Sequence, residues 1–142
     1  MTVPAAVAMA ITFVWVGLVV GISFIEAPLK FRAPGVTLPI GLGIGRLVFR
    51  AVNGVEVVFA VLVVAALIAG IGDRIAAVGL MVAVAVLAVQ LIAVRPTLTR
   101  RSDAILAGGD APRSSAHHVF IALELAKLVA LLVGGIAALA SL

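Results

Sequence analysis

The 142-residue sequence has no cysteine, a single tryptophan and few charged residues. Without cysteine the chain cannot form a disulfide, a thiolate metal site or a cysteine nucleophile. Only 11% of the residues are charged and 65% are hydrophobic, which gives a mean hydropathy of +1.38. Soluble globular domains do not have this composition, so the sequence predicts an integral membrane protein. Glycine-rich phosphate loops, Ser-His-Asp sets and metalloprotease helix motifs are also missing.

Four apolar blocks divide the sequence, at about residues 3–25, 45–71, 75–94 and 116–142. Each reaches the ~20 residues that a helix needs to cross the hydrocarbon layer. The strands of a membrane barrel would alternate apolar and polar residues, and these blocks do not. The predicted fold is therefore all-α: a four-transmembrane-helix bundle that forms a single domain over 1–142.

The net charge of +4 comes from basic residues beside the first and third connections between these blocks. Arg74 is the exception, because it lies beside the second connection, where the charge of the adjacent Asp73 balances it. The positive-inside rule places the two basic connections in the cytoplasm and both termini outside. A basic rim beside anionic lipid explains the charge, so the expected partner is the bilayer and no nucleic acid is expected. The residues of this rim are Lys30, Arg32, Arg46, Arg50, Arg95, Arg100, Arg101 and Arg113.

Prolines are predicted to end two of the helices, at Pro28 and at Pro96. Segment 28–45 mixes prolines and glycines with apolar residues, which favours a re-entrant or interfacial segment; a loop that only anchors the chain is the alternative. Segment 97–115 is polar and is predicted to be a cytosolic loop, with a short helix near 103–107.

The same polar pattern occurs twice, inside two of the apolar blocks. Both sets follow offsets of 0, 3, 7 and 10 residues, so each lies along one helical stripe. The first set is Arg46, Phe49, Asn53 and Glu56, and the second is His117, Phe120, Glu124 and Lys127. The shared order favours two helical hairpins related as a parallel repeat, as in some transporters; chance agreement is the alternative.

Two charged residues of these stripes lie near mid-membrane. At a rise of about 1.5 Å per residue, Glu56 and Lys127 are equally deep, close to the centre of a ~30 Å hydrocarbon core. Because an unpaired charge is costly there, we expect Glu56 to pair with Lys127. Asn53 and Glu124 are then expected at the same depth in the membrane. The alternative is that these polar residues only stabilise helix packing through contacts between helices.

Three more polar residues are expected in the same inner half. Gln90 lies about 7 Å along its helix from Arg95. Glu26 is at the inner end of the first helix, where Arg46 or Arg95 is its expected partner. Three carboxylates among several cations would form a site for a proton or a polar headgroup.

Two adjacent histidines, His117 and His118, suggest a metal site at first sight. Neighbouring residues on a helix point about 100° apart, so this pair does not match the usual spacing of metal ligands and no metal is expected. Imidazole titrates near neutral pH, so His117 is instead a candidate proton relay.

Gly17 and Gly21 form a Gly-x-x-x-Gly step in the first block. This motif allows close helix approach, within the bundle or across a homodimer, and we expect a homo-oligomer.

Several short motifs of this chain occur together in a known group of proteins. Residues 21–31 read Gly-Ile-Ser-Phe-Ile-Glu-Ala-Pro-Leu-Lys-Phe, and Leu38-Pro39, Gly45-Arg46, Phe49 and residues 53–56 follow. With the His-Phe-Glu-Lys pattern of 117–127, they resemble a group of small bacterial four-helix membrane proteins of unknown function. The resemblance implies a four-helix fold in the bacterial cytoplasmic membrane. It implies no activity and no cofactor.

Three hypotheses about function remain. The first is a small proton-linked transporter, exporter or small-molecule binder, in which Glu56 and Glu124 exchange protons while Lys127 and Arg46 supply countercharge. The second is a membrane-embedded enzyme or a lipid- or quinone-binding protein, with His117 or Glu124 as acid or base. The third is an accessory subunit of a membrane complex. The candidate binding and proton-coupling residues are Glu56, Glu124, Lys127, Asn53, Arg46, His117, Glu26, Gln90 and Arg95.

Overall fold

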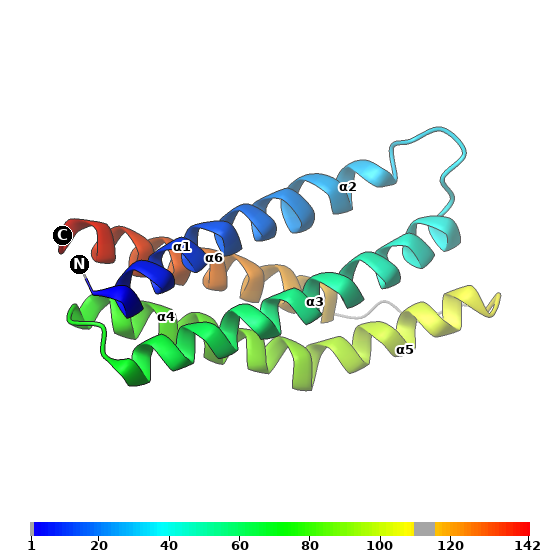
Figure 1. The fold of residues 1–142 in the computed structure, drawn as a ribbon. Coiled ribbons are helices and arrows are strands. Elements are labelled where there is room, and N and C mark those ends of the chain that lie inside the picture. Colours follow the sequence, from blue (N-terminus) through cyan, green and yellow to red (C-terminus); the bar gives the residue numbers. More distant parts are fainter. Residues whose placement is uncertain (1, 110–115) are drawn as a thin grey trace.

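The computed structural model describes residues 2–109 and 116–142 and confirms an all-α bundle (Figure 1). In this part of the chain four helices are long and apolar enough to cross a membrane. The elements of the first two are α1 (Val3–Val19), η1 (Val20–Glu26), α2 (Ala27–Lys30) and α3 (Leu38–Ala69). Those of the last two are α4 (Arg74–Val89), η2 (Gln90–Val94), α5 (Arg95–Leu106) and α6 (Ala116–Ala140). The segments η1 and η2 are π-helical turns inside otherwise continuous helices.

Three of the helices begin at a side-chain cap. Thr2, Thr37 and Asp73 each accept a hydrogen bond from the backbone N–H three residues further on, at 3.3, 3.4 and 2.8 Å respectively. These caps satisfy amide groups that have no partner inside the helix. The helix starts therefore follow from local sequence.

The prediction that Pro28 and Pro96 end helices is wrong. Each proline is the second residue of a new α-helical segment, in α2 and α5, and a π-helical turn comes directly before that segment. Proline lacks an N–H and its ring crowds the carbonyl four residues earlier. A wider π turn accommodates this defect, and the first turn of the next segment does not need the missing N–H. The helices predicted to end near 25 and 94 therefore run on to Lys30 and Leu106.

The two connections at the basic end are shorter than predicted. Only 31–37 is non-helical between α2 and α3, because the Thr37 cap starts a regular helix that contains Pro39 in its first turn. The predicted re-entrant segment over 28–45 is therefore wrong. The predicted loop over 97–115 is helical as far as Leu106. Its remainder at 110–115, including Arg113, lies outside the described residues.

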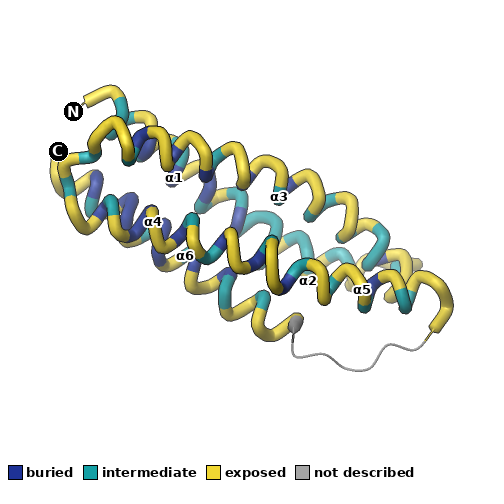
Figure 2. The backbone as a smooth tube through the Cα atoms, turned by 90° about the horizontal axis from the view of Figure 1, so that it is seen from below, coloured by how far each residue is buried: buried dark blue, intermediate teal, exposed yellow. Residues whose placement is uncertain are grey.

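The helices of the bundle pack through interfaces of unequal extent. Helix α1 packs between α3 and α6, α4 shares its most extensive interface with α6, and α3 meets α4 only narrowly. Both termini lie at one end of the bundle and the connection 31–37 lies at the other (Figure 1). Buried residues line the inside of the helices while exposed residues cover the outside (Figure 2). Many of the exposed residues are large and apolar, among them Leu47, Ile68 and Ile92, as expected of surfaces that face lipid.

Within the bundle, the close helix approach predicted for Gly17 and Gly21 occurs instead at Gly79 and Gly134. A Cβ atom built on Gly17 or Gly21 would meet no other atom within 4 Å, so these glycines make no close helix contact inside the bundle. On Gly79 of α4 the same atom would lie 2.9 Å from the backbone nitrogen of Gly134 and 3.0 Å from the carbonyl oxygen of Ala130. Small residues thus bring the backbones of α4 and α6 together.

Candidate functional site

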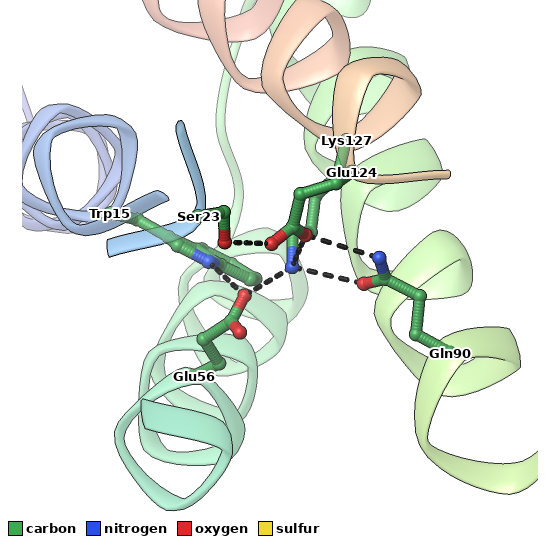
Figure 3. Close-up of polar contacts among 6 residues, drawn as sticks. All are labelled: Trp15, Ser23, Glu56, Gln90, Glu124 and Lys127. Atoms are coloured by element: carbon green, nitrogen blue, oxygen red, sulfur yellow. Dashed lines mark hydrogen bonds and ion pairs between the residues drawn. The ribbon is translucent and has the colours of Figure 1, made fainter. Parts of the chain in front are cut away.

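Six polar or aromatic side chains from all four long helices meet inside the bundle (Figure 3). We call this set the central cluster. It contains three charged groups, whose side chains are only 1–3% exposed, and three uncharged hydrogen-bonding groups. Its members are Trp15 of α1, Ser23 of η1, Glu56 of α3, Gln90 of η2, and Glu124 and Lys127 of α6.

The Lys127 ammonium group lies at the centre of the cluster. Its Nζ atom is 2.5 Å from Glu56 Oε2 and 2.6 Å from Glu124 Oε1. It also donates a hydrogen bond to Gln90 Oε1 at 3.0 Å. An ammonium group has three hydrogens, and these three acceptors match them. The predicted Glu56–Lys127 ion pair is therefore confirmed.

Neutral donors hold both carboxylates in place. Trp15 Nε1 donates to Glu56 Oε2 at 2.8 Å. Gln90 Nε2 donates to Glu124 Oε1 at 3.1 Å, and Ser23 Oγ donates to Glu124 Oε2. The Gln90 amide thus bridges Glu124 and Lys127, with its oxygen toward the cation and its nitrogen toward the carboxylate (Figure 3).

One carboxylate oxygen of the cluster has spare capacity. Both contacts of Glu56, from Lys127 and from Trp15, use Oε2. No hydrogen bond from the described residues reaches its other oxygen, Oε1. A carboxylate oxygen accepts hydrogen bonds when ionised and carries the proton when neutral. Oε1 of Glu56 therefore has capacity for a further hydrogen bond.

The charges of the cluster do not cancel. Two ionised carboxylates and one ammonium group sum to −1 when all three are charged. A buried charge is expensive to maintain, and its cost falls when hydrogen bonds and opposite charges surround it. With all three groups ionised, the cluster therefore carries one buried negative charge, and the Arg95 cation interacts electrostatically with both of its carboxylates.

Local helix geometry helps to build this cluster. Ser23 lies in η1 and Gln90 begins η2, so both π-helical turns contribute a side chain that contacts Glu124. A π turn rotates the side chains that follow it relative to a regular helix, and such turns are frequent at functional sites. The prolines that cause these turns thus shape the cluster indirectly.

Neither Ser23 nor Trp15 was among the candidate site residues predicted from the sequence. Trp15 is fully buried and also contacts the Phe59 ring, with 6.0 Å between ring centroids. A buried indole usually finds an acceptor for its N–H, so a tryptophan deep inside a span was an available signal. A serine in an apolar helix gives no comparable signal, because it can bond to its own backbone.

Two charged residues of the predicted site, Arg46 and Glu26, lie outside the central cluster in other ion pairs. Arg46 pairs with Asp103 at 2.5 Å, and both side chains are about half exposed, at 42% and 54%. This pair forms because α5 continues past Pro96 and brings Asp103 opposite α3. Glu26 pairs with Lys30 at 3.6 Å, so its predicted pairing with Arg46 or Arg95 is wrong. The continuous helix through α2 places Lys30 one turn from Glu26.

Two of the other predicted site residues also lie apart from the central cluster. Asn53 is half-buried, and its side chain makes no hydrogen bond with the described residues. His117 is exposed at the start of α6, with its ring 6.0 Å from that of His118. Within 2–109 and 116–142 no group of three histidine, cysteine or acidic residues is arranged to hold a metal ion.

Arg95 lies against two aromatic rings at the basic end of the bundle, apart from the central cluster. Its Cζ atom is 4.7 Å from the centre of the Phe49 ring and 5.1 Å from that of Phe120. The two rings meet edge to face, 5.9 Å apart. The two stripes predicted from the sequence therefore do face each other, with Phe49 against Phe120 at one level and Glu56 against Lys127 deeper in the bundle.

No protein-family model, no curated protein and no solved structure matches this chain.

Proposed function

We propose that this chain is a small proton-linked transporter whose proton-exchanging site is the central cluster. The observation that carries the proposal is a buried Glu–Lys–Glu set with a sum charge of −1 and one carboxylate oxygen, Glu56 Oε1, without a hydrogen bond from the described residues. Ionisable groups inside transmembrane helices are characteristic of proton relays and substrate pathways. A purely structural role would be served as well by small residues, without buried charge.

The residues around the central cluster support a mechanism in which protons reach it from one side of the membrane at a time. Between the cluster and the end that holds the termini, the bundle interior is filled by apolar side chains, among them Val63, Leu80, Ala83 and Leu131. Toward the basic end the interior is more polar, with Asn53 and Arg95. In this proposal protons reach the cluster from the more polar basic end, and a second state opens the apolar half.

We further propose that the basic end faces the cytoplasm, since the seven basic rim residues that the structure describes belong to α2, α3, α5 and the connection 31–37. Membership of the group of small bacterial four-helix membrane proteins and assembly into a homo-oligomer belong to the same proposal. Gly17 is exposed and Gly21 is half-buried, and a Cβ atom on either would meet no other atom within 4 Å, which leaves this face of the first helix available to a second copy.

The test is proton movement tied to solute movement. Everted membrane vesicles that contain the protein are energised, and organic anions and cations are added singly while a dye reports the pH gradient. We expect one class of solute to collapse the gradient in wild-type vesicles and to have no effect in Glu56→Gln vesicles. The matched control is Asp103→Asn, which removes a carboxylate from the half-exposed pair with Arg46 and should behave as wild type.

Two results would overturn this proposal. One is a solute that the wild-type protein moves at the same rate with and without a pH gradient. The other is equal proton movement in wild-type and Glu56→Gln vesicles, which would remove the central cluster from the proton pathway.

A further inference from the structure

Arg95 is a half-buried cation with one hydrogen-bond donor that has no acceptor in the described part of the chain. Its Nη2 atom is buried and has no hydrogen-bond partner among the described residues. Phe49 and Phe120 flank the guanidinium group, and they stabilise its charge through their π electrons. Phenyl rings offer no conventional acceptor, however. A buried donor left without an acceptor costs about 1–3 kcal/mol, and more when it is charged.

A second cation lies beside the same ring. Lys30 Nζ is 5.9 Å from the centre of the Phe49 ring, and the Lys30 side chain is 9% exposed. It occupies space that Gly45 leaves open, since a Cβ atom on Gly45 would lie 3.1 Å from Nζ. Arg95 and Lys30 therefore share one aromatic neighbour. Like charges brought together in a region of low dielectric repel each other unless an anion compensates them.

The acidic residue at this level compensates only one of these cations. Glu26 lies 3.6 Å from Lys30, and its Oε2 atom is buried without a hydrogen bond from the described residues. The salt bridges of the described chain include none to Arg95. Glu124 and Glu56 of the central cluster act on Arg95 electrostatically but form no salt bridge with it. One buried N–H of Arg95 therefore remains for a ligand.

We propose that Arg95, Phe49, Phe120 and Lys30 form a binding site for an oxyanion, such as the phosphate or carboxylate group of an amphiphilic molecule. The planar guanidinium group presents paired N–H donors that match the two oxygens of such a group. The phenyl rings offer apolar surface for the adjoining part of the ligand. Basic pockets between transmembrane helices are known to hold anionic headgroups. This site does not depend on proton exchange in the central cluster.

Two sources of the oxyanion are compatible with this chemistry, a lipid headgroup and a water-soluble anion. The protein is purified in a neutral detergent, and its binding of phosphatidylglycerol is measured by native mass spectrometry, with phosphatidylcholine as the uncharged comparison. Binding of inorganic phosphate is measured separately by calorimetry. Preferential binding of phosphatidylglycerol assigns a lipid to the site, and saturable binding of phosphate assigns a soluble anion.

The variants test whether Arg95 carries the binding. We expect Arg95→Gln to weaken binding of the effective probe by at least about tenfold, a change equivalent to ~1.4 kcal/mol. Arg95→Lys keeps the charge and loses the planar fork, so its affinity should fall between those of Arg95→Gln and wild type. Arg50→Gln changes the net charge equally at an exposed position of α3 and should bind as wild type does. Circular dichroism checks that each variant is folded.

Two outcomes would overturn this inference. In one, the wild type binds neither probe better than phosphatidylcholine or buffer. In the other, Arg50→Gln weakens binding as much as Arg95→Gln, which would show that the whole basic end attracts anions without a specific site. If Arg95→Gln does not fold, Arg95→Lys decides, because binding equal to that of wild type would exclude recognition by the guanidinium fork.

Discussion

Replacement of Lys127 by methionine is expected to destabilise the protein by about 3–5 kcal/mol. Lys127 is the one cation in contact with Glu56 and Glu124 among the described residues, and its side chain is 1% exposed. Methionine has a similar volume, so the loss would come from two buried carboxylates that no longer have a counterion. Unfolding by a denaturing detergent, followed by circular dichroism, measures the change.

The control for this prediction is Arg46→Met. It removes the same kind of charge from an ion pair with a distance of 2.5 Å, but in this pair both side chains are about half exposed. Exposed pairs contribute about 0–1 kcal/mol, so we expect Arg46→Met to stay within that range. Equal stability losses in the two variants would mean that the cluster is not shielded from solvent.

Replacement of Trp15 by alanine should cost about 3–5 kcal/mol, as large-to-small changes of buried aromatic residues do. Trp15 is 0% exposed, contacts Phe59 and donates to Glu56. The variant would therefore lose packing between helices and also leave Glu56 with one donor fewer. Because both effects act at the same place, thermal unfolding monitored by circular dichroism should show a large loss.

A second variant separates the two effects. Trp15→Phe loses the N–H donor but keeps an aromatic ring and much of the buried volume, so we expect a smaller loss of about 1–3 kcal/mol. Val14→Ala, on the lipid-facing side of the same helix with 60% exposure, should change stability by no more than about 0.5 kcal/mol. If Trp15→Phe is as stable as wild type, the Trp15–Glu56 hydrogen bond makes no contribution to stability.

The sequence contained enough information to predict the fold and the centre of the site. Long apolar blocks predict spans because lipid leaves backbone groups no partners outside a helix. The Glu56–Lys127 pair was predictable for a similar reason, since equal depth and the cost of unpaired charge leave few other partners. Gln90 was also predicted in the same half of the bundle, although its bridging contacts to Glu124 and Lys127 depend on how the helices are rotated.

Other features depended on geometry that spacing alone does not determine. The rule that proline ends a helix failed at Pro28 and Pro96 because a π turn absorbs the defect. That error hid the extension of α5, and with it the Arg46–Asp103 pair. Ser23 was missed because a single hydroxyl in an apolar helix shows no periodic pattern. The contact of Gly79 with α6 depends on helix crossing positions, which the sequence does not display.

The most direct test of the central cluster is a double-mutant cycle on Glu56→Gln and Lys127→Met. Unfolding free energies are measured for wild type, both single variants and the double variant, in the same detergent. If the two groups form one buried charge set, the double variant should be more stable than the sum of the single losses predicts, by about 0.5–3 kcal/mol. Losses that simply add would contradict this account, because they would show that Glu56 and Lys127 do not depend on each other inside the membrane.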